Sequence, residues 1–238
     1  NGKSALASGI ALWSLLTGPK GGEVYSCAAD KDQARIVFGE AKKMLEADPD
    51  LSEMAKIYRD AIEIPSTGSV YRVLSAEAFT KEGLSPTMVI FDELHAQPDR
   101  ELFDVMQLAQ GARGSLATMI CITTAGQKSD KSGQDSIAYK LYQYGQKVAR
   151  GEIDDPSFFM AWWEAEADAD YKDPKTWADA NPGYGDINDI SDFESTVLRT
   201  PEAEFRTKRC NQWVSSNLTW LPSGKWDELE SDREITPD

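Results

Sequence analysis

Two short stretches of this chain carry residue types that together suit the binding of a nucleoside triphosphate and Mg²⁺. The first is "NGKS" at residues 1–4, a Gly-Lys-Ser triplet that runs directly into an apolar-periodic segment. In a phosphate-binding loop the lysine contacts the β and γ phosphates, the serine ligates Mg²⁺, and the following helix points its N-terminus at the anion. Gly2, Lys3 and Ser4 would take those positions. The upstream half of the signature is missing, so a helix-capping turn is the better explanation of this triplet taken alone.

The second stretch, "MVIFDELH" at residues 88–95, has four apolar residues followed by two acids, the pattern of a Walker B strand. Asp92 would hold the Mg²⁺ ion, and Glu93 would orient and deprotonate the attacking water. Parallel sheets bind ligands at the carboxyl ends of their strands, where these acids would lie. Alone, a buried strand ending at a solvated acidic turn is equally plausible. However, the two acids follow the Gly-Lys-Ser triplet by about ninety residues. Together the two motifs favour a site in which both bind the same Mg²⁺ ion, from opposite sides.

A third stretch, "MICITTAG" at residues 119–126, ends a further apolar run in two threonines. In many motor ATPases the strand beside Walker B ends in small polar residues that sense the γ-phosphate. The hydroxyls of Thr123 and Thr124 suit that role because a hydroxyl can change partners between phosphate, water and Glu93. Without the other two motifs, these would be ordinary β-branched strand residues before a glycine turn.

Three cations are candidates for an arginine finger, a positive charge from a neighbouring subunit that raises the hydrolysis rate by roughly 10³–10⁵-fold. They are Arg113, Arg100 and Lys81, and for any one of them a plain surface role is the better explanation. His95 is the one histidine of the chain, and we expect it to hydrogen-bond locally rather than to take part in catalysis.

The elements that must position these residues alternate between strands and helices, which predicts an α/β fold with a mostly parallel sheet flanked by helices. The apolar runs lack alternation, as expected for strands covered on both faces. Asp30 is a predicted cap for the second helix. The predicted strands are 23–29, 61–65, 70–76, 87–93 and 116–126, and the predicted helices are 4–17, 31–47, 99–110 and 133–150.

After residue 150 the sequence becomes acidic, with several prolines and tryptophans. One strand is predicted at 158–165, and helices are predicted at 189–200 and 201–214. We therefore divide the chain into a core of residues 1–150 and a smaller subdomain of residues 151–238. The tryptophans of this half could stack on bases, but packing is the more common role. They are Trp162, Trp163, Trp177, Trp213, Trp220 and Trp226.

The bulk composition narrows the range of functions. The 238 residues carry a net charge of −15, so any contact with DNA needs a small positive patch or another part of the protein. No apolar run reaches the eighteen residues of a membrane span. Cys27, Cys121 and Cys210 are far apart, and the first two lie in strand-like runs. They are expected to be small buried hydrophobic residues rather than disulfide or metal ligands.

With "NGKS", "AADKDQA", "MVIFDELHAQPDRELFDVM", "ARGSLATMICITTAG", "DANPGYG" and "EFRTKRCNQWVSS" in this order, the chain resembles the large terminase subunit of tailed bacteriophages. It is similar to the branch with Asp-Glu-Leu-His in Walker B and Thr-Thr-Ala-Gly in the coupling motif. The resemblance implies a P-loop ATPase domain that uses ATP and Mg²⁺ to drive double-stranded DNA into a capsid. It implies Walker A, Walker B and coupling roles for Lys3 and Ser4, for Asp92 and Glu93, and for Thr123, Thr124 and Ala125.

The resemblance also implies partners and location: a portal protein, a small terminase subunit, a homo-oligomeric ring on the capsid, and the host cytoplasm, with no membrane contact. The chain starts within Walker A and ends about where a nuclease domain would begin. We therefore expect a truncated ATPase core with a linker subdomain, which alone would be a poor ATPase. Glu82 stands where some terminases carry an arginine, so the finger stays unassigned.

Two other functions fit parts of the sequence. "DELH" also matches a DExH helicase, although no second helicase core with an arginine-rich motif is present in the chain. A non-catalytic nucleotide-binding or scaffold module that kept the fold is the other alternative.

Overall fold

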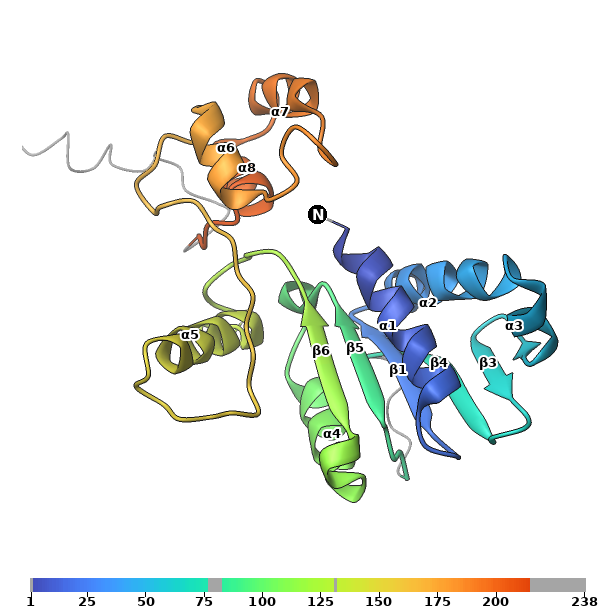
Figure 1. Ribbon diagram of the computed structural model, residues 1–238. Helices are drawn as coiled ribbons and strands as arrows, with labels where there is room; N and C mark the ends of the chain where they lie inside the picture. The colour runs from blue at the N-terminus through green and yellow to red at the C-terminus, as the bar shows by residue number, and fades with distance from the viewer. Residues whose placement is uncertain (1, 77–82, 131, 215–238) are drawn as a thin grey trace, which may run out of the picture.

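The centre of the structure is a six-stranded sheet with the order β2-β3-β4-β1-β5-β6 (Figure 1). The structure is a computed structural model that describes residues 2–76, 83–130 and 132–214. β4, β1, β5 and β6 run parallel, while β3 is antiparallel to both β2 and β4. The strands are β1 (Glu23–Ala28), β2 (Lys56–Ile57), β3 (Ala61–Ile64), β4 (Ser69–Ser75), β5 (Met88–Asp92) and β6 (Thr118–Ile122).

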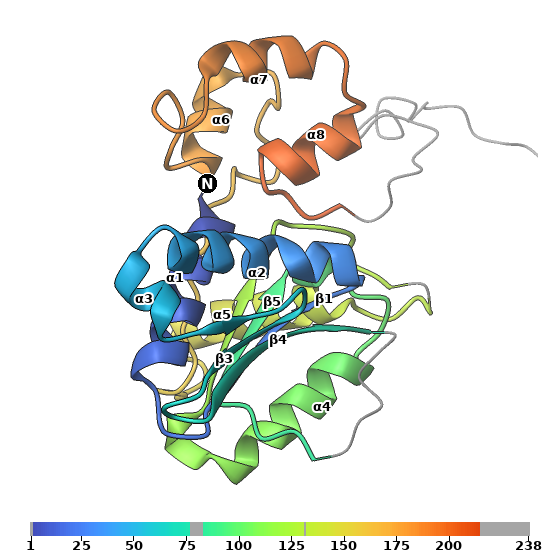
Figure 2. The same ribbon diagram turned by 90° about the vertical axis from the view of Figure 1, so that its right-hand side faces the viewer.

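Helices cover both faces of this sheet (Figure 2). α1 (Lys3–Thr17), α2 (Lys31–Glu46) and the short α3 (Pro49–Glu53) lie on one face. α4 (Glu101–Ala109) and α5 (Ile137–Ala149) pack on the other. Short 3₁₀ turns at Leu94–Ala96, Gln110–Ala112 and Gly114–Leu116 complete the connections.

The position of β5 between β1 and β6 explains why its sequence is a continuous apolar run. Successive side chains of a strand face opposite sides of the sheet. Met88 and Ile90 join the apolar cluster beneath α1 and α2, whereas Val89 and Phe91 join the cluster beneath α4 and α5. All five residues of β5 are buried. The prediction of a strand covered on both faces is therefore confirmed for β5.

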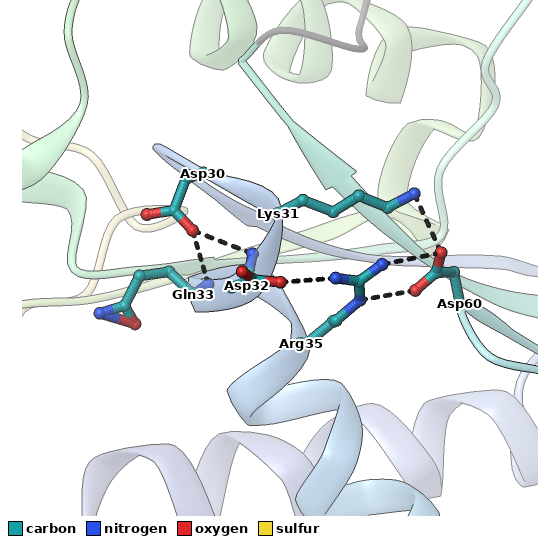
Figure 3. Close-up of polar contacts among 6 residues, drawn as sticks. All are labelled: Asp30, Lys31, Asp32, Gln33, Arg35 and Asp60. Atoms are coloured by element: carbon teal, nitrogen blue, oxygen red, sulfur yellow. Dashed lines mark hydrogen bonds and ion pairs between the residues drawn. The ribbon is translucent and has the colours of Figure 1, made fainter.

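The start of α2 is held by a network of charged side chains (Figure 3). Asp30 caps the helix as predicted, with Oδ1 accepting the backbone N–H groups of Asp32 and Gln33 at 2.9 Å each. The Arg35 guanidinium donates to both carboxylate oxygens of Asp60, at 2.7 and 3.2 Å. Lys31 adds an ion pair to Asp60 at 2.9 Å. These contacts attach α2 to the segment just before β3.

Residues 151–214, the described part of the chain after 150, contain three helices with their own apolar centre. α6 (Pro174–Ala180), α7 (Ile190–Val197) and α8 (Glu202–Arg209) pack around Trp177, Phe193 and Phe205. Figure 1 shows them on the side of the sheet to which β5 and β6 point, near the start of α1. The division of the chain at residue 150 stays a prediction.

Most of the predicted elements are confirmed, several with shorter ends, but the strand at 158–165 is wrong. Residues 158–165 form neither a helix nor a strand with any described part of the chain. Its backbone is bonded instead to the chain after α8, through Ala165 N–H to the Cys210 carbonyl at 3.0 Å. Of the apolar residues that suggested a strand, Trp162 stacks on Trp213 and Phe158 packs against Tyr144, whereas Phe159 and Trp163 are exposed.

The expectation of a fully buried strand is also wrong for β6. Its five residues are partly or fully exposed, and Cys121, expected to be buried, is exposed. The cause is the strand order: within the described residues β6 pairs with β5 alone and ends the sheet. Cys27 and Cys210 are buried, as expected for Cys27.

No helix within the described ranges has the length and apolar character needed to cross a bilayer.

Candidate active site

The two acids of the second motif end β5 and begin a sharp turn. Asp92 is the last residue of the strand and pairs in register with Ile122 of β6. Glu93 follows with φ 48° and ψ 56°, a left-handed conformation that side chains other than glycine rarely adopt. Leu94, 1% exposed, anchors the turn in the core. Strained residues of this kind cluster at functional sites.

Asp92 is a buried carboxylate with an unsatisfied oxygen. It is 4% exposed, and its Oδ1 has no hydrogen-bond partner among the described residues. Burial, reinforced by the neighbouring negative charge of Glu93, raises the pKa of Asp92 above its usual value. A buried anionic oxygen without a donor is poised to accept a cation.

The same carboxylate fits Mg²⁺ by its chemistry. No cluster of three or more metal-ligating side chains occurs in the part of the chain that the structure describes. Mg²⁺ in nucleotide-hydrolysing sites needs no such cage, because one or two protein oxygens, substrate phosphates and waters complete its shell. Asp92 together with a serine hydroxyl at the start of α1 would satisfy that requirement.

Glu93 is tied to β6 through His95. Its Oε2 lies 3.0 Å from His95 Nδ1, which also lies 3.0 Å from Thr123 Oγ1. The backbone N–H of His95 donates to the same Thr123 hydroxyl at 3.1 Å, and that hydroxyl donates to the Thr124 carbonyl at 2.9 Å. His95 therefore bonds locally, as predicted, and it joins the second motif to the third.

The surroundings of Glu93 favour its ionised form. Burial alone would raise its pKa, but the hydrogen bond and charge of His95, the charge of Lys3 and the backbone N–H of Thr124 outweigh it. The pKa of Glu93 is therefore below its usual value. A carboxylate that is ionised and held in place can accept a proton.

Gly126, the last residue of the third motif, makes room for His95. A Cβ atom at this position would lie 3.0 Å from His95 Cβ and 3.3 Å from its ring. Only glycine leaves the imidazole free to approach the end of β6 this closely.

The start of α1 faces the acid pair. Gly2 forms the N-cap in a left-handed conformation with φ 69°, and no side chain caps the first turn. The charge of Lys3 favours the ionised form of both acids, although burial still leaves the pKa of Asp92 raised. Ser4 lies in the same turn, and its carbonyl accepts a bond from the Ser8 hydroxyl at 2.6 Å. Free N–H groups at a helix start are suited to bind an anion.

A cavity of about 430 Å³ opens between the start of α1, the end of β6 and the end of α8, and neither Asp92 nor Glu93 is among the described residues that line it. Lys3 lines it from α1, and Thr123 and Thr124 line it from the end of β6. Arg209 and Asn211 line it from the end of α8. The first and third motifs thus share one cavity, and His95 connects the third motif to the acid pair.

The two described candidates for the arginine finger lie outside this cavity. Arg113 donates to the carbonyls of Gly21 and Ser85, at 2.8 and 3.0 Å, and so ties together the loops before β1 and β5 at the amino ends of the strands. Arg100 pairs with Asp104 at 3.0 Å on the surface of α4. Lys81 lies outside the described residues. The finger stays a prediction.

Three of the tryptophans named above, Trp162, Trp177 and Trp213, pack as expected, but Trp163 does not. Trp162 and Trp213 stack at 5.7 Å between ring centres, and both lie against Tyr142. Trp177 is in the centre of the α6–α8 cluster. Trp163 is 53% exposed. Trp220 and Trp226 lie outside the described residues.

One residue with direct contacts to the third motif was missed by sequence reasoning. The side chain of Asn211 accepts the Ala125 N–H at 2.6 Å across 86 positions of sequence. The signal that was available is its residue type, since asparagine tolerates a left-handed backbone better than most residues.

Comparisons with known proteins identify the family of the chain. Residues 1–146 match the family described as "Terminase large subunit, ATPase domain". The terminase large subunit of Enterobacteria phage HK97 is 30% identical over 243 residues, covering 95% of this chain and 45% of that protein. The terminase large subunit of Lactococcus phage p2 is 26% identical over 193 residues, covering 79% of this chain and 34% of that protein. The chain therefore spans less than half the length of these relatives.

Solved structures show the same fold. The crystal structure of the HK97 large terminase matches with a TM-score of 0.74 and 29% identity, covering 90% of this chain and 44% of that one. The ATPase domain of the large terminase of Thermus phage P74-26 matches with a TM-score of 0.63 and 19% identity, covering 90% and 84%. These matches confirm the predicted α/β fold. Since the family match covers more than half of the chain, the chain belongs to the family of terminase large subunit ATPase domains.

Proposed function

We propose that this chain binds ATP with Mg²⁺ and hydrolyses it to move double-stranded DNA into a phage capsid. One observation carries the chemical part: the start of α1 and the acid pair at the end of β5 meet at the same edge of the sheet. Two findings support this closeness: Lys3 lines one cavity with Thr123 and Thr124, and its charge favours the ionised form of both carboxyl groups. The membership of the family supports the coupling to DNA packaging.

Each residue of the site then has a distinct role. Gly2 and the N–H groups of the first turn receive the phosphates, and Lys3 neutralises their charge. Ser4 and Asp92 hold Mg²⁺, which supplies positive charge to the phosphate oxygens. Glu93 accepts the proton of the attacking water. His95 fixes the Glu93 carboxylate relative to the end of β6.

Thr123 and Thr124 report on the γ-phosphate. In the structure the Thr123 hydroxyl is engaged by His95 and by its own chain. A phosphate oxygen in the cavity that both threonines line would compete for these hydroxyls. Loss of the phosphate would restore the bonds seen here.

The family resemblance extends the proposal to partners. The motor would act in the host cytoplasm as a ring of identical subunits on the portal protein, together with a small terminase subunit. In such a ring, Arg113 or Arg100 is a candidate for the arginine finger that one subunit supplies to the next. The net charge of −15 requires that DNA be held by a local positive patch or by another part of the protein.

The test is phosphate release by the full-length protein with Mg²⁺ and DNA, wild type against Glu93→Gln. Loss of a general base lowers the rate by roughly 10²–10⁴-fold. ATP binding is expected to remain, because glutamine keeps the size of the side chain. Glu101→Gln, an exposed acid at the start of α4, is the matched control and is expected to keep the parent rate.

Hydrolysis by Glu93→Gln at the parent rate would refute the role of Glu93. A wild-type protein that binds ATP without hydrolysing it would instead identify a non-catalytic nucleotide-binding module.

A further inference from the structure

Asn211 occupies a strained position between two parts of the molecule. Its backbone has φ 54°, in the left-handed region. Its Oδ1 accepts the N–H of Ala125, and its Nδ2 donates to the Trp163 carbonyl, both at 2.6 Å. One side chain thus joins the end of β6 to the segment that leads into α6.

The chain around Asn211 continues this connection. Val214 N–H donates to the Gly126 carbonyl at 3.3 Å, and Lys128 N–H donates to the Val214 carbonyl at 3.0 Å. The two segments run parallel there, with a bridge between Gln127 and Val214. Residues 211–214 therefore lie alongside residues 125–128, directly after the two threonines.

On its other side, Asn211 is fixed to the α6–α8 cluster. The preceding residue, Cys210, is fully buried in that cluster, and its carbonyl accepts the Ala165 N–H at 3.0 Å. The following residue, Gln212, donates its N–H to the Arg206 carbonyl of α8 at 2.9 Å. A chain of hydrogen bonds thus connects the Ala125 N–H, through Asn211 and its two neighbours, to α8.

The residue type matches this role closely. Glycine would accept the backbone conformation but make neither bond. Aspartate would keep the acceptor for Ala125 but lose the donor, and it would place a negative oxygen beside the Trp163 carbonyl. Asparagine supplies the left-handed backbone, the acceptor and the donor together.

We infer that Asn211 is a positioning residue that transmits the nucleotide state of the Thr123–Thr124 loop to helices α6–α8. This inference rests on the proposed function, since it needs a phosphate that engages those threonines. When the Thr123 hydroxyl leaves the Thr124 carbonyl for the phosphate, the peptide unit that joins this carbonyl to the Ala125 N–H is released. Asn211, which accepts that N–H, then moves the end of α8 with it.

The test is the change in amide hydrogen exchange of residues 174–209 when a non-hydrolysable ATP analogue with Mg²⁺ saturates the full-length protein. The wild type is expected to show a change in protection across α6–α8. Asn211 also lines the cavity, so Asn211→Gly is measured at an analogue concentration that saturates this variant. The effect of the analogue on the opening equilibrium of these amides is then expected to be about 5- to 150-fold smaller than in the wild type, the usual range of coupling between sites. Glycine tolerates the backbone angle, so this variant is expected to fold.

Two further variants separate transmission from stability. Gln212→Ala removes the neighbouring amide, which bonds to Arg206 and to the Glu166 carbonyl within the C-terminal part alone. It is expected to destabilise α6–α8 yet keep the nucleotide-dependent change. Asn211→Asp keeps the bond to Ala125 and is expected to lie between wild type and Asn211→Gly.

The outcomes are distinguishable. A change of wild-type size in both Asn211 variants would overturn the inference and leave the proposed function intact. A wild type that hydrolyses ATP but shows no change in α6–α8 would overturn it as well. A wild type that does not bind the analogue would overturn the proposed function, and the inference with it.

Discussion

Asp60 and Asp92 are carboxylates in two regions of one sheet-and-helix core, and their surroundings are opposite. At the start of α2, Asp60 receives two bonds from Arg35 and an ion pair from Lys31 (Figure 3). These hydrogen bonds hold its pKa well below the usual value. At the end of β5, Asp92 is buried with one oxygen unpartnered among the described residues, and its pKa is raised.

The difference separates a carboxylate that supports the fold from one that is kept for a ligand. The charge of Asp60 is compensated within the chain, so its network contributes to stability. The charge of Asp92 is compensated only partly, which disfavours the folded state until a cation arrives. Buried carboxylates with only partly compensated charge are concentrated at functional sites of proteins.

The largest expected effect comes from Asp92→Asn. Because this change removes the ligand for Mg²⁺, we expect phosphate release by the full-length protein to fall by roughly a thousandfold, in line with several kcal/mol of lost charge stabilisation. The midpoint of thermal unfolding without nucleotide should stay the same or rise, since a buried unpaired charge has gone. A large loss of stability together with wild-type hydrolysis would show that Asp92 supports the fold rather than binding a ligand.

A smaller and opposite effect is expected from Asp60→Asn. At pH 7 the free energy of unfolding should fall by about 1 kcal/mol, as for a partly exposed ion-pair network, with hydrolysis almost unchanged. Urea unfolding and phosphate release on the same preparation measure both quantities.

The pH dependence of stability tests the role of Asp60 further. The pKa of Asp60 is lower in the folded state than the unfolded value of about 3.9. Its contribution is therefore fully present above about pH 4 and is lost as the pH falls through the folded pKa. The stability gap between wild type and Asp60→Asn should shrink in that direction. A gap that stays constant down to pH 2 would show that the network acts through packing and not through charge.

Local signals in the sequence were sufficient to predict the strand that carries the acid pair and the start of helix α2. The apolar run 88–91 followed by two acids predicted β5 and the position of its carboxylates, because a doubly covered strand has to be apolar throughout. Asp30 predicted the start of α2 because a side-chain oxygen is needed for the first N–H groups. Asp48-Pro49 and Asp173-Pro174 carry the same type of signal for α3 and α6, which were missed.

Features that depend on distant contacts could not be predicted in this way. The apolar residues of 158–165 fit a strand locally, but the pairing partner that a strand needs is absent from the described sheet, and the Trp162 ring packs on Trp213 instead. The exposure of β6 follows from its place in the strand order, which its own residues do not encode. The contact of Asn211 with Ala125 depends on the packing of α8 against the end of β6.

The central claim is that Lys3 and Asp92 meet around one Mg²⁺–triphosphate. A double-mutant cycle on Mg²⁺–ATP binding by the full-length protein, with Lys3→Ala, Asp92→Asn and both together, measures this by titration calorimetry. The account predicts that the two losses are not additive, with an interaction energy of about 0.5–3 kcal/mol, because both side chains act on the same ligand. Losses that simply add would show that the two residues act at separate sites and would contradict the account.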